Sequence, residues 1–135
     1  MRASLREKIT RIAYQNLYKH HDKGLNNKRK RSFHYTFLTL RNNILHWEIN
    51  LENKSHPESF RQGYFGSTQH SELRAIVTFP HPTNILNKLD LWNIRINRHN
   101  EVANSRPCER CEDFISEFNF RHIFYTNSKG CWELL

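Results

Sequence analysis

The stretch Leu-Asp-Leu-Trp-Asn-Ile-Arg-Ile-Asn, residues 89–97, lies at the centre of the predicted fold. Its apolar residues alternate with polar ones, which is typical of a β-strand with one buried face. Residues 69–78 before it and 108–118 after it have the apolar spacing of short helices. The second of these helices is expected to bury Phe114, Ile115 and Phe118.

Two strands and a longer helix are predicted before this central unit. Residues 33–40 are rich in aromatic and β-branched residues, and residues 44–51 alternate, with a hairpin turn at Arg41-Asn42-Asn43. Residues 4–20 are predicted to form an amphipathic helix, because apolar residues recur at helical spacing at Leu5, Ile9, Ile12, Ala13 and Leu17.

The chain ends with two further predicted strands, at residues 122–125 and 131–135. The turn-forming Asn127 to Gly130 between them is short, so the two strands are expected to be an antiparallel hairpin. Residues 81–88 are expected to be an inserted loop. The order α-β-β-α-β-α-β-β predicts an α/β sandwich.

Composition agrees with a single globular domain. A chain of 135 residues can bury a core without disulfides. At 37% hydrophobic and 13% aromatic, it is expected to build much of that core from aromatic residues such as Trp47 and Trp92. No run of about 18 apolar residues exists, so no membrane-spanning helix is expected.

The cysteines and the N-terminus indicate an intracellular, cytoplasmic protein. Three cysteines are an odd number for a disulfide framework. Two of them lie three positions apart, which favours metal binding in a reducing compartment. Cys131, beside Trp132 in an apolar strand, is expected to be a buried core thiol. The N-terminus lacks the apolar region of a secretory signal, although its basic amphipathic pattern leaves an organellar transit peptide open.

The net charge of +8 comes from the N-terminal segment. Residues 1–31 contain ten Lys/Arg and two acids, whereas residues 32–135 contain eleven of each. We therefore divide the domain into an N-terminal helix with a basic arm, 1–31, and a body, 32–135. Localised positive charge attracts phosphate-bearing partners. Contact with phosphate or nucleic acid is predicted for the densest part of the arm, which is Lys28, Arg29, Lys30 and Arg31. A solvated loop or a localisation signal would have the same composition.

Two short motifs carry the predicted chemistry, His70-Ser71-Glu72 and Pro107-Cys108-Glu109-Arg110-Cys111. Two cysteines three positions apart at the start of a helix can reach one ion, and a helix N-terminus favours the thiolate form. With His70 as a third ligand, this set suits Zn²⁺ and leaves its fourth position for water. Glu72, two residues from His70, is placed to move protons beside the metal.

The motifs and the elements around them resemble the zinc-dependent cytidine/deoxycytidylate deaminase superfamily. The likeness rests on the two motifs and on the strand His122-Ile123-Phe124-Tyr125. It implies a three-layer α-β-α sandwich with a mixed five-stranded sheet, like that of cytidine deaminase. It also implies that Glu72 is the general acid/base, and that Zn²⁺ is bound by His70, Cys108 and Cys111.

The resemblance extends to a loop and shows two departures. Residues 53–57 are similar to a family loop in which an asparagine contacts the substrate sugar, which implies substrate binding by Asn53. Ser71 stands where small apolar residues are usual, and the spacing between the motifs is long. The hairpin predicted at the C-terminus resembles the hairpin-ended branch of the superfamily.

The function expected from these features is hydrolytic deamination of a cytosine-type base to uracil. Its substrate would be a nucleotide or single-stranded DNA or RNA. One alternative is a non-catalytic nucleic-acid-binding module whose structural zinc uses Cys108, Cys111, Cys131 and a histidine such as His122. Another is a deaminase fold that has lost activity and only binds a partner.

Overall fold

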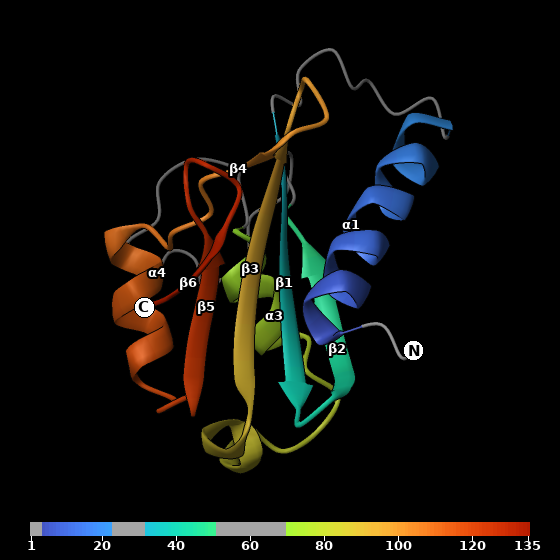
Figure 1. Cartoon of the computed structure of the whole chain (residues 1–135). Helices are drawn as coiled ribbons and strands as arrows, with labels where there is room; N and C mark the ends of the chain where they lie inside the picture. Colours follow the sequence, from blue (N-terminus) through green and yellow to red (C-terminus); the bar gives the residue numbers. More distant parts are fainter. Residues whose placement is uncertain (1–3, 23–31, 51–69) are drawn as a thin grey trace.

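The middle layer of the protein is a mixed β-sheet, described here by a computed structural model over residues 4–22, 32–50 and 70–135 (Figure 1). Five strands are hydrogen-bonded in the order β2-β1-β3-β5-β6. Their bounds are β1 Ser32–Leu40, β2 Asn43–Ile49, β3 Asp90–Asn97, β5 His122–Thr126 and β6 Trp132–Leu134. Strands β3 and β5 are parallel, and the other neighbours on this path are antiparallel. The predicted mixed sheet and C-terminal hairpin are confirmed.

Helices cover both faces of the sheet, which makes the fold a three-layer α/β sandwich (Figure 1). Helix α1, Leu5–Asp22, packs on one face, and helices α3, Ser71–Val77, and α4, Glu109–Ser116, pack on the other. Because side chains alternate along a strand, β1 supplies both cores. Phe33, Tyr35 and Phe37 lie under α1, while Leu38 packs in the core beneath α3 and α4.

The core under α1 is largely aromatic, as the composition predicts. Trp92 is buried there, and its ring stacks on Phe124 with centroids 4.1 Å apart. Trp47 is partly buried against the same cluster. The helical spacing predicted for α1 is also confirmed, since Ile9, Ala13 and Leu17 are its buried residues.

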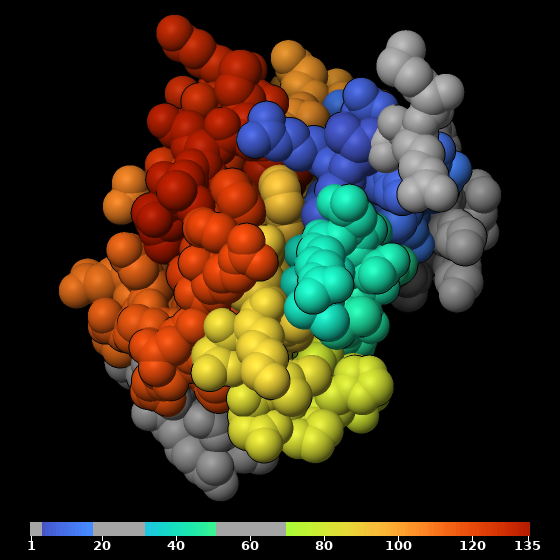
Figure 2. All heavy atoms as spheres, turned by 60° about the horizontal axis from the view of Figure 1, so that its bottom comes forward, coloured from blue at the N-terminus to red at the C-terminus, as the bar shows by residue number. Residues whose placement is uncertain are grey.

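Two elements of the structure differ from the sequence prediction. Residues expected to be an inserted loop contain a 3-10 helix, η2, Thr83–Lys88, which buries Leu86 completely. Figure 2 shows this segment, in yellow, beside the β1–β2 hairpin, in cyan. A two-residue strand, β4, Val102–Ala103, pairs with β3 and adds a sixth strand beside the main path. It was not expected, because two residues are too few to show a periodic pattern.

A polar cluster holds α3 on the edge strand β2. The Arg74 guanidinium lies 3.0 Å from the Glu48 carboxylate and donates to the Ile49 carbonyl at 2.6 Å. His46 Nε2 lies 2.8 Å from Thr78 Oγ1 at the C-terminal end of the helix. These contacts set the position of α3 along the sheet.

Within the described residues, no helix is long and apolar enough to cross a membrane.

Truncating the core under α1 should destabilise the protein without touching the other face of the sheet. Ile9 is fully buried, so we expect Ile9→Ala to lower the free energy of unfolding by about 2–5 kcal/mol. The exposed Gln15 on the same helix provides the control, and Gln15→Ala should change it by less than about 0.5 kcal/mol. Urea unfolding followed by circular dichroism measures both. Equal effects for the two variants would contradict the packing of α1.

The stability should also depend on the protonation of His46. Burial lowers the pKa of His46 below its usual value of 6.5. The folded protein therefore binds fewer protons there than the unfolded chain, so stability should fall as the pH drops below about 6.5. His46→Gln removes this loss and keeps a side chain able to contact Thr78. Urea unfolding at about pH 7.5 and about pH 5.5 should show the variant gaining on the wild type at the lower pH. Parallel pH curves would show that His46 contributes nothing to the dependence.

Candidate metal centre

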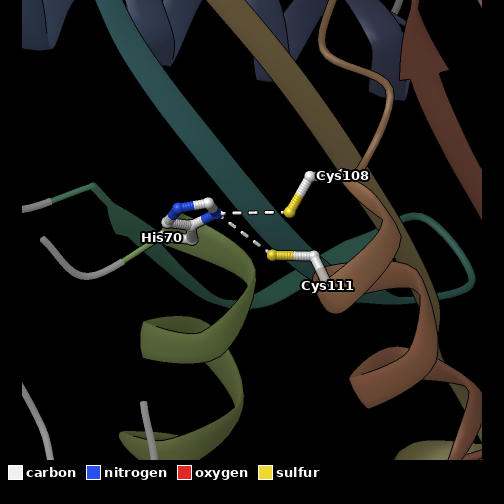
Figure 3. A group of neighbouring side chains, drawn as sticks. All are labelled: His70, Cys108 and Cys111. Carbon is white, nitrogen blue, oxygen red and sulfur yellow. Dashed lines mark hydrogen bonds between the residues drawn. The ribbon is translucent and has the colours of Figure 1, made fainter. Parts of the chain in front are cut away.

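His70, Cys108 and Cys111 meet where the N-terminal ends of α3 and α4 lie side by side (Figure 3). Their donor atoms all lie within 4.8 Å of one another. His70 Nδ1 is 3.7 Å from Cys108 Sγ and 3.3 Å from Cys111 Sγ. No second group of this kind occurs among the side chains of residues 4–17, 32–50 and 70–135. The three residues that the sequence predicts as ligands are therefore brought together and could hold a metal ion.

The local backbone explains why these side chains are available to an ion. His70 and Cys108 are the N-cap residues of α3 and α4, and both have the extended backbone conformation of that position. Neither side chain caps its own helix by a hydrogen bond. Cys111 lies within the first turn of α4, one helical turn after Cys108. Both cysteines can therefore point to the same place as His70.

Burial differs among the three donors. Cys111 is buried in the core with Phe114 and Ile115, Cys108 is exposed, and His70 is intermediate. Cys111 anchors the cluster to the packed helices, whereas the exposed Cys108 leaves it open to solvent. A ligand could therefore approach an ion from the side of Cys108.

The electrostatics of the cluster favour the thiolate form of Cys108 and the protonated form of His70, which must lose that proton to bind a metal. Hydrogen bonding with the Cys111 side chain lowers the pKa of Cys108 to about 3, and the contact with His70 acts in the same direction. Hydrogen bonding with Cys108 raises the pKa of His70 above its usual value, although burial opposes this. The thiolate is the form that binds metals. The cluster therefore prepares Cys108 as a metal ligand.

Glu72 lies next to this cluster but is not part of it. It is in the first turn of α3, is only 4% exposed, and raises the pKa of His70 through its charge. Its Oε1 atom accepts a hydrogen bond from Ser71 Oγ at 3.1 Å. A carboxylate this well buried needs such a partner, because burying an unpaired charge is costly. The sequence prediction placed Glu72 beside the metal site, and the structure does so as well.

A group of buried polar residues near Glu72 was missed from the sequence. Thr36, Asn93, Ser105 and Thr126 are all buried and hydrogen-bonded to one another or to Ser71. A signal was present, since the polar Asn93 lies between the apolar Trp92 and Ile94 at the centre of the strand. Alternation alone could not show that Asn93 faces the side of the sheet where the two metal motifs meet.

Other predicted residues are not brought to this site. Cys131 is exposed rather than buried in the core, because it lies in the turn that leads from Asn127 into the edge strand β6. His122 Nδ1 contacts Asp90 Oδ1 at 3.0 Å instead of the cysteines. Neither belongs to the donor cluster, so the described residues do not assemble the alternative four-ligand structural site.

The remaining predicted site residues lie outside the described part of the chain. They are Asn53 and the basic residues Lys28, Arg29, Lys30 and Arg31.

Comparison with models of known protein families and with curated proteins finds no match to this chain.

Metal binding should require the three clustered donors and no other cysteine. We expect purified protein loaded with Zn²⁺ to retain a single equivalent after desalting. His70→Ala and Cys111→Ser should each lose most of it, because two donors remain. Cys131→Ser is the matched control, since it removes an exposed thiol outside the cluster. Elemental analysis under reducing conditions gives the stoichiometry. Loss of metal in the Cys131 variant, or retention in the other two, would contradict the assignment.

Proposed function

We propose that this chain is a zinc-dependent hydrolytic deaminase that converts a cytosine-type base to uracil. The observation that carries the proposal is the cluster of one imidazole and two thiols, with the buried carboxylate of Glu72 in the first turn of α3. This is the donor set and proton carrier that hydrolysis of an amine on an aromatic ring requires.

The donor set supports zinc as the metal. Zinc favours thiolate and imidazole ligands, and catalytic zinc sites have three protein ligands with one position open. With bonds of about 2.3 Å to sulfur and about 2.0 Å to nitrogen in tetrahedral geometry, such donors lie about 3.5 Å apart. The distances from His70 Nδ1 to the two sulfurs, 3.7 and 3.3 Å, agree with this spacing. When bound, zinc supplies the acidity that makes water a nucleophile near neutral pH.

Glu72 is the proton carrier in this proposal. Deamination forms a bond from a water oxygen to the amine-bearing ring carbon and breaks the bond from that carbon to nitrogen. A carboxylate oxygen of Glu72 accepts a proton from the water and passes it to the neighbouring ring nitrogen. It then carries the proton of the newly formed hydroxyl to the amino group, which leaves as ammonia. The products are uracil and ammonia, so atoms and charge balance. Burial of Glu72 beside the cluster supports this role, because it keeps bulk water from competing for the proton.

The proposed substrate is a nucleotide or a single strand of DNA or RNA. Its support is the excess positive charge of the chain, +8, which attracts phosphates. Next to the site, the exposed Arg106 places its guanidinium 5.7 Å from the centre of the Tyr125 ring. Arg106 is an exposed cation two residues before Cys108 in the sequence. Contacts by Asn53 and by the basic arm remain predictions.

Glu72→Gln should separate catalysis from metal binding. The amide keeps the size of the side chain but cannot take up a proton, so we expect the rate to fall by about 10² to 10⁴-fold. Zinc content should stay unchanged, because Glu72 is not a donor in the cluster. Mass spectrometry of cytidine, cytidine nucleotides and single-stranded DNA and RNA oligonucleotides measures the conversion of cytosine to uracil.

Glu117→Gln is the matched control for this experiment, because Glu117 is an exposed carboxylate at the far end of α4. It should retain full activity. If wild-type protein with bound zinc converts no member of the panel, the enzymatic proposal fails. Binding of single strands without conversion, unaffected by Glu72→Gln, would instead favour the non-catalytic nucleic-acid-binding module.

A further inference from the structure

Nearly all buried serine, threonine, asparagine and glutamate side chains of the described residues belong to one hydrogen-bonded chain. There are seven of them, and only Thr39 lies outside this chain, where it accepts a hydrogen bond from Trp92. The other six are Thr36, Ser71, Glu72, Asn93, Ser105 and Thr126. Buried polar groups are costly unless they are paired. Their concentration at one place therefore calls for a specific reason.

The hydrogen-bonded chain starts at Glu72 on α3 and runs over strands β1 and β3. Ser71 Oγ lies 3.1 Å from Glu72 Oε1 and 2.8 Å from Thr36 Oγ1 on β1. Thr36 Oγ1 donates its one hydrogen to Asn93 Oδ1 on β3 at 2.6 Å, so the Ser71 hydroxyl hydrogen serves both Glu72 Oε1 and Thr36 Oγ1. Thr36 is thus the central link, since its single hydroxyl contacts both α3 and β3. Each step joins a different element of the fold.

The chain ends at the loop that leads into α4. Ser105 Oγ donates to the backbone carbonyl of Asn93 at 2.8 Å and contacts Thr126 Oγ1 at 2.8 Å. The Thr126 backbone N–H donates to Ser105 Oγ at 2.7 Å, and the Ser105 N–H donates to the Thr126 carbonyl at 2.7 Å. Ser105 is therefore held by β3 and β5 together, three residues before Cys108.

The hydrogen-bonded chain links the two metal motifs. Ser71 is part of the first motif and directly follows His70, and Ser105 lies three residues before Cys108 of the second motif. These motifs are far apart in the sequence, and each is carried on a short helix. Hydrogen bonds constrain distance and direction more narrowly than apolar packing does, so the chain constrains how far His70 stands from Cys108. It also orients the Glu72 carboxylate through Ser71.

We propose that this buried chain, with Thr36 as its central link, is a positioning device for the metal centre. It holds His70 and Cys108 at ligating separation before an ion binds, and it sets the orientation of Glu72. The first part rests on the geometry alone, whereas the second rests on the proposed function. Thr36 acts through Ser71 and Asn93, to which its hydroxyl is hydrogen-bonded. Residues that orient metal ligands commonly affect metal affinity by about 10 to 100-fold when mutated.

The chain offers a matched pair of substitutions to test this. Thr36 and Thr39 are both on β1 and both fully buried, and each makes hydrogen bonds through its hydroxyl. Thr36→Val should weaken Zn²⁺ binding by about tenfold or more. Thr39→Val should leave it unchanged, although it also removes a buried hydroxyl. Competition of each protein with a chromophoric chelator for Zn²⁺, under reducing conditions, gives the affinities without any need for turnover.

Conservative variants separate positioning from stability. Thr36→Ser keeps the hydroxyl and loses a methyl group, so it should retain wild-type Zn²⁺ affinity even if its unfolding free energy falls. Ser71→Ala breaks the chain one link further on with a minimal change of volume, and it should repeat the loss seen in Thr36→Val if that protein does not fold. The proposal is overturned if Thr36→Val and Ser71→Ala bind Zn²⁺ as tightly as wild type. It is also overturned if Thr39→Val or Thr36→Ser weakens binding equally.

The role toward Glu72 has a separate readout. With saturating Zn²⁺, Ser71→Ala should lower kcat for base deamination by about tenfold while KM stays the same, because only the orientation of the proton carrier changes. Unchanged kcat together with weakened Zn²⁺ affinity would limit the chain to positioning the donors. If wild-type protein deaminates nothing, the proposed function fails, while the Zn²⁺ affinities still decide whether the chain positions the metal centre.

Discussion

The cluster of His70, Cys108 and Cys111 depends on the packing of α3 and α4 side by side against one face of the sheet. Leu73 and Ile76 of α3 share a buried cluster with Phe114 and Ile115 of α4. Each such side chain contributes about 1.5–3 kcal/mol when it is removed from water. Because both helices begin at the same end of the sheet, this burial brings His70 and Cys108 together, although the two residues are far apart in the sequence.

The site lacks two ordinary sources of helix stability. The N-cap positions of α3 and α4 are filled by His70 and Cys108, whose side chains make no capping hydrogen bond. A good cap contributes about 1 kcal/mol to a helix. The short helix α3 is instead held from outside, by the salt bridge of Arg74 to Glu48 at its C-terminal part and by Ser71 at its start. An ion that binds only the folded cluster would offset the missing caps through mass action.

Most of the fold could be predicted from periodicity, and the failures share a cause. Alternation and helical spacing depend on which face of an element is buried, so they located α1, β3 and α4 well. The 3-10 helix η2 was missed because it is too short for a pattern and has few buried residues besides Leu86. Cys131 was expected to be buried because its neighbours are apolar. Its exposure follows from its place in the turn before β6, at the edge of the sheet, which no local pattern reports.

The sequence by itself determined which groups are available for chemistry: the donors His70, Cys108 and Cys111, and the carboxylate of Glu72. Residue type and spacing are local properties, so they can be read without the fold. Only the tertiary structure decided that the three donors lie within 4.8 Å of one another and that Thr36 and Asn93 link their two motifs. Those contacts join β1, β3 and the ends of two helices. Strand order and the facing of side chains decide them, because hydrogen bonds form between atoms that are close in space, whatever their separation in the chain.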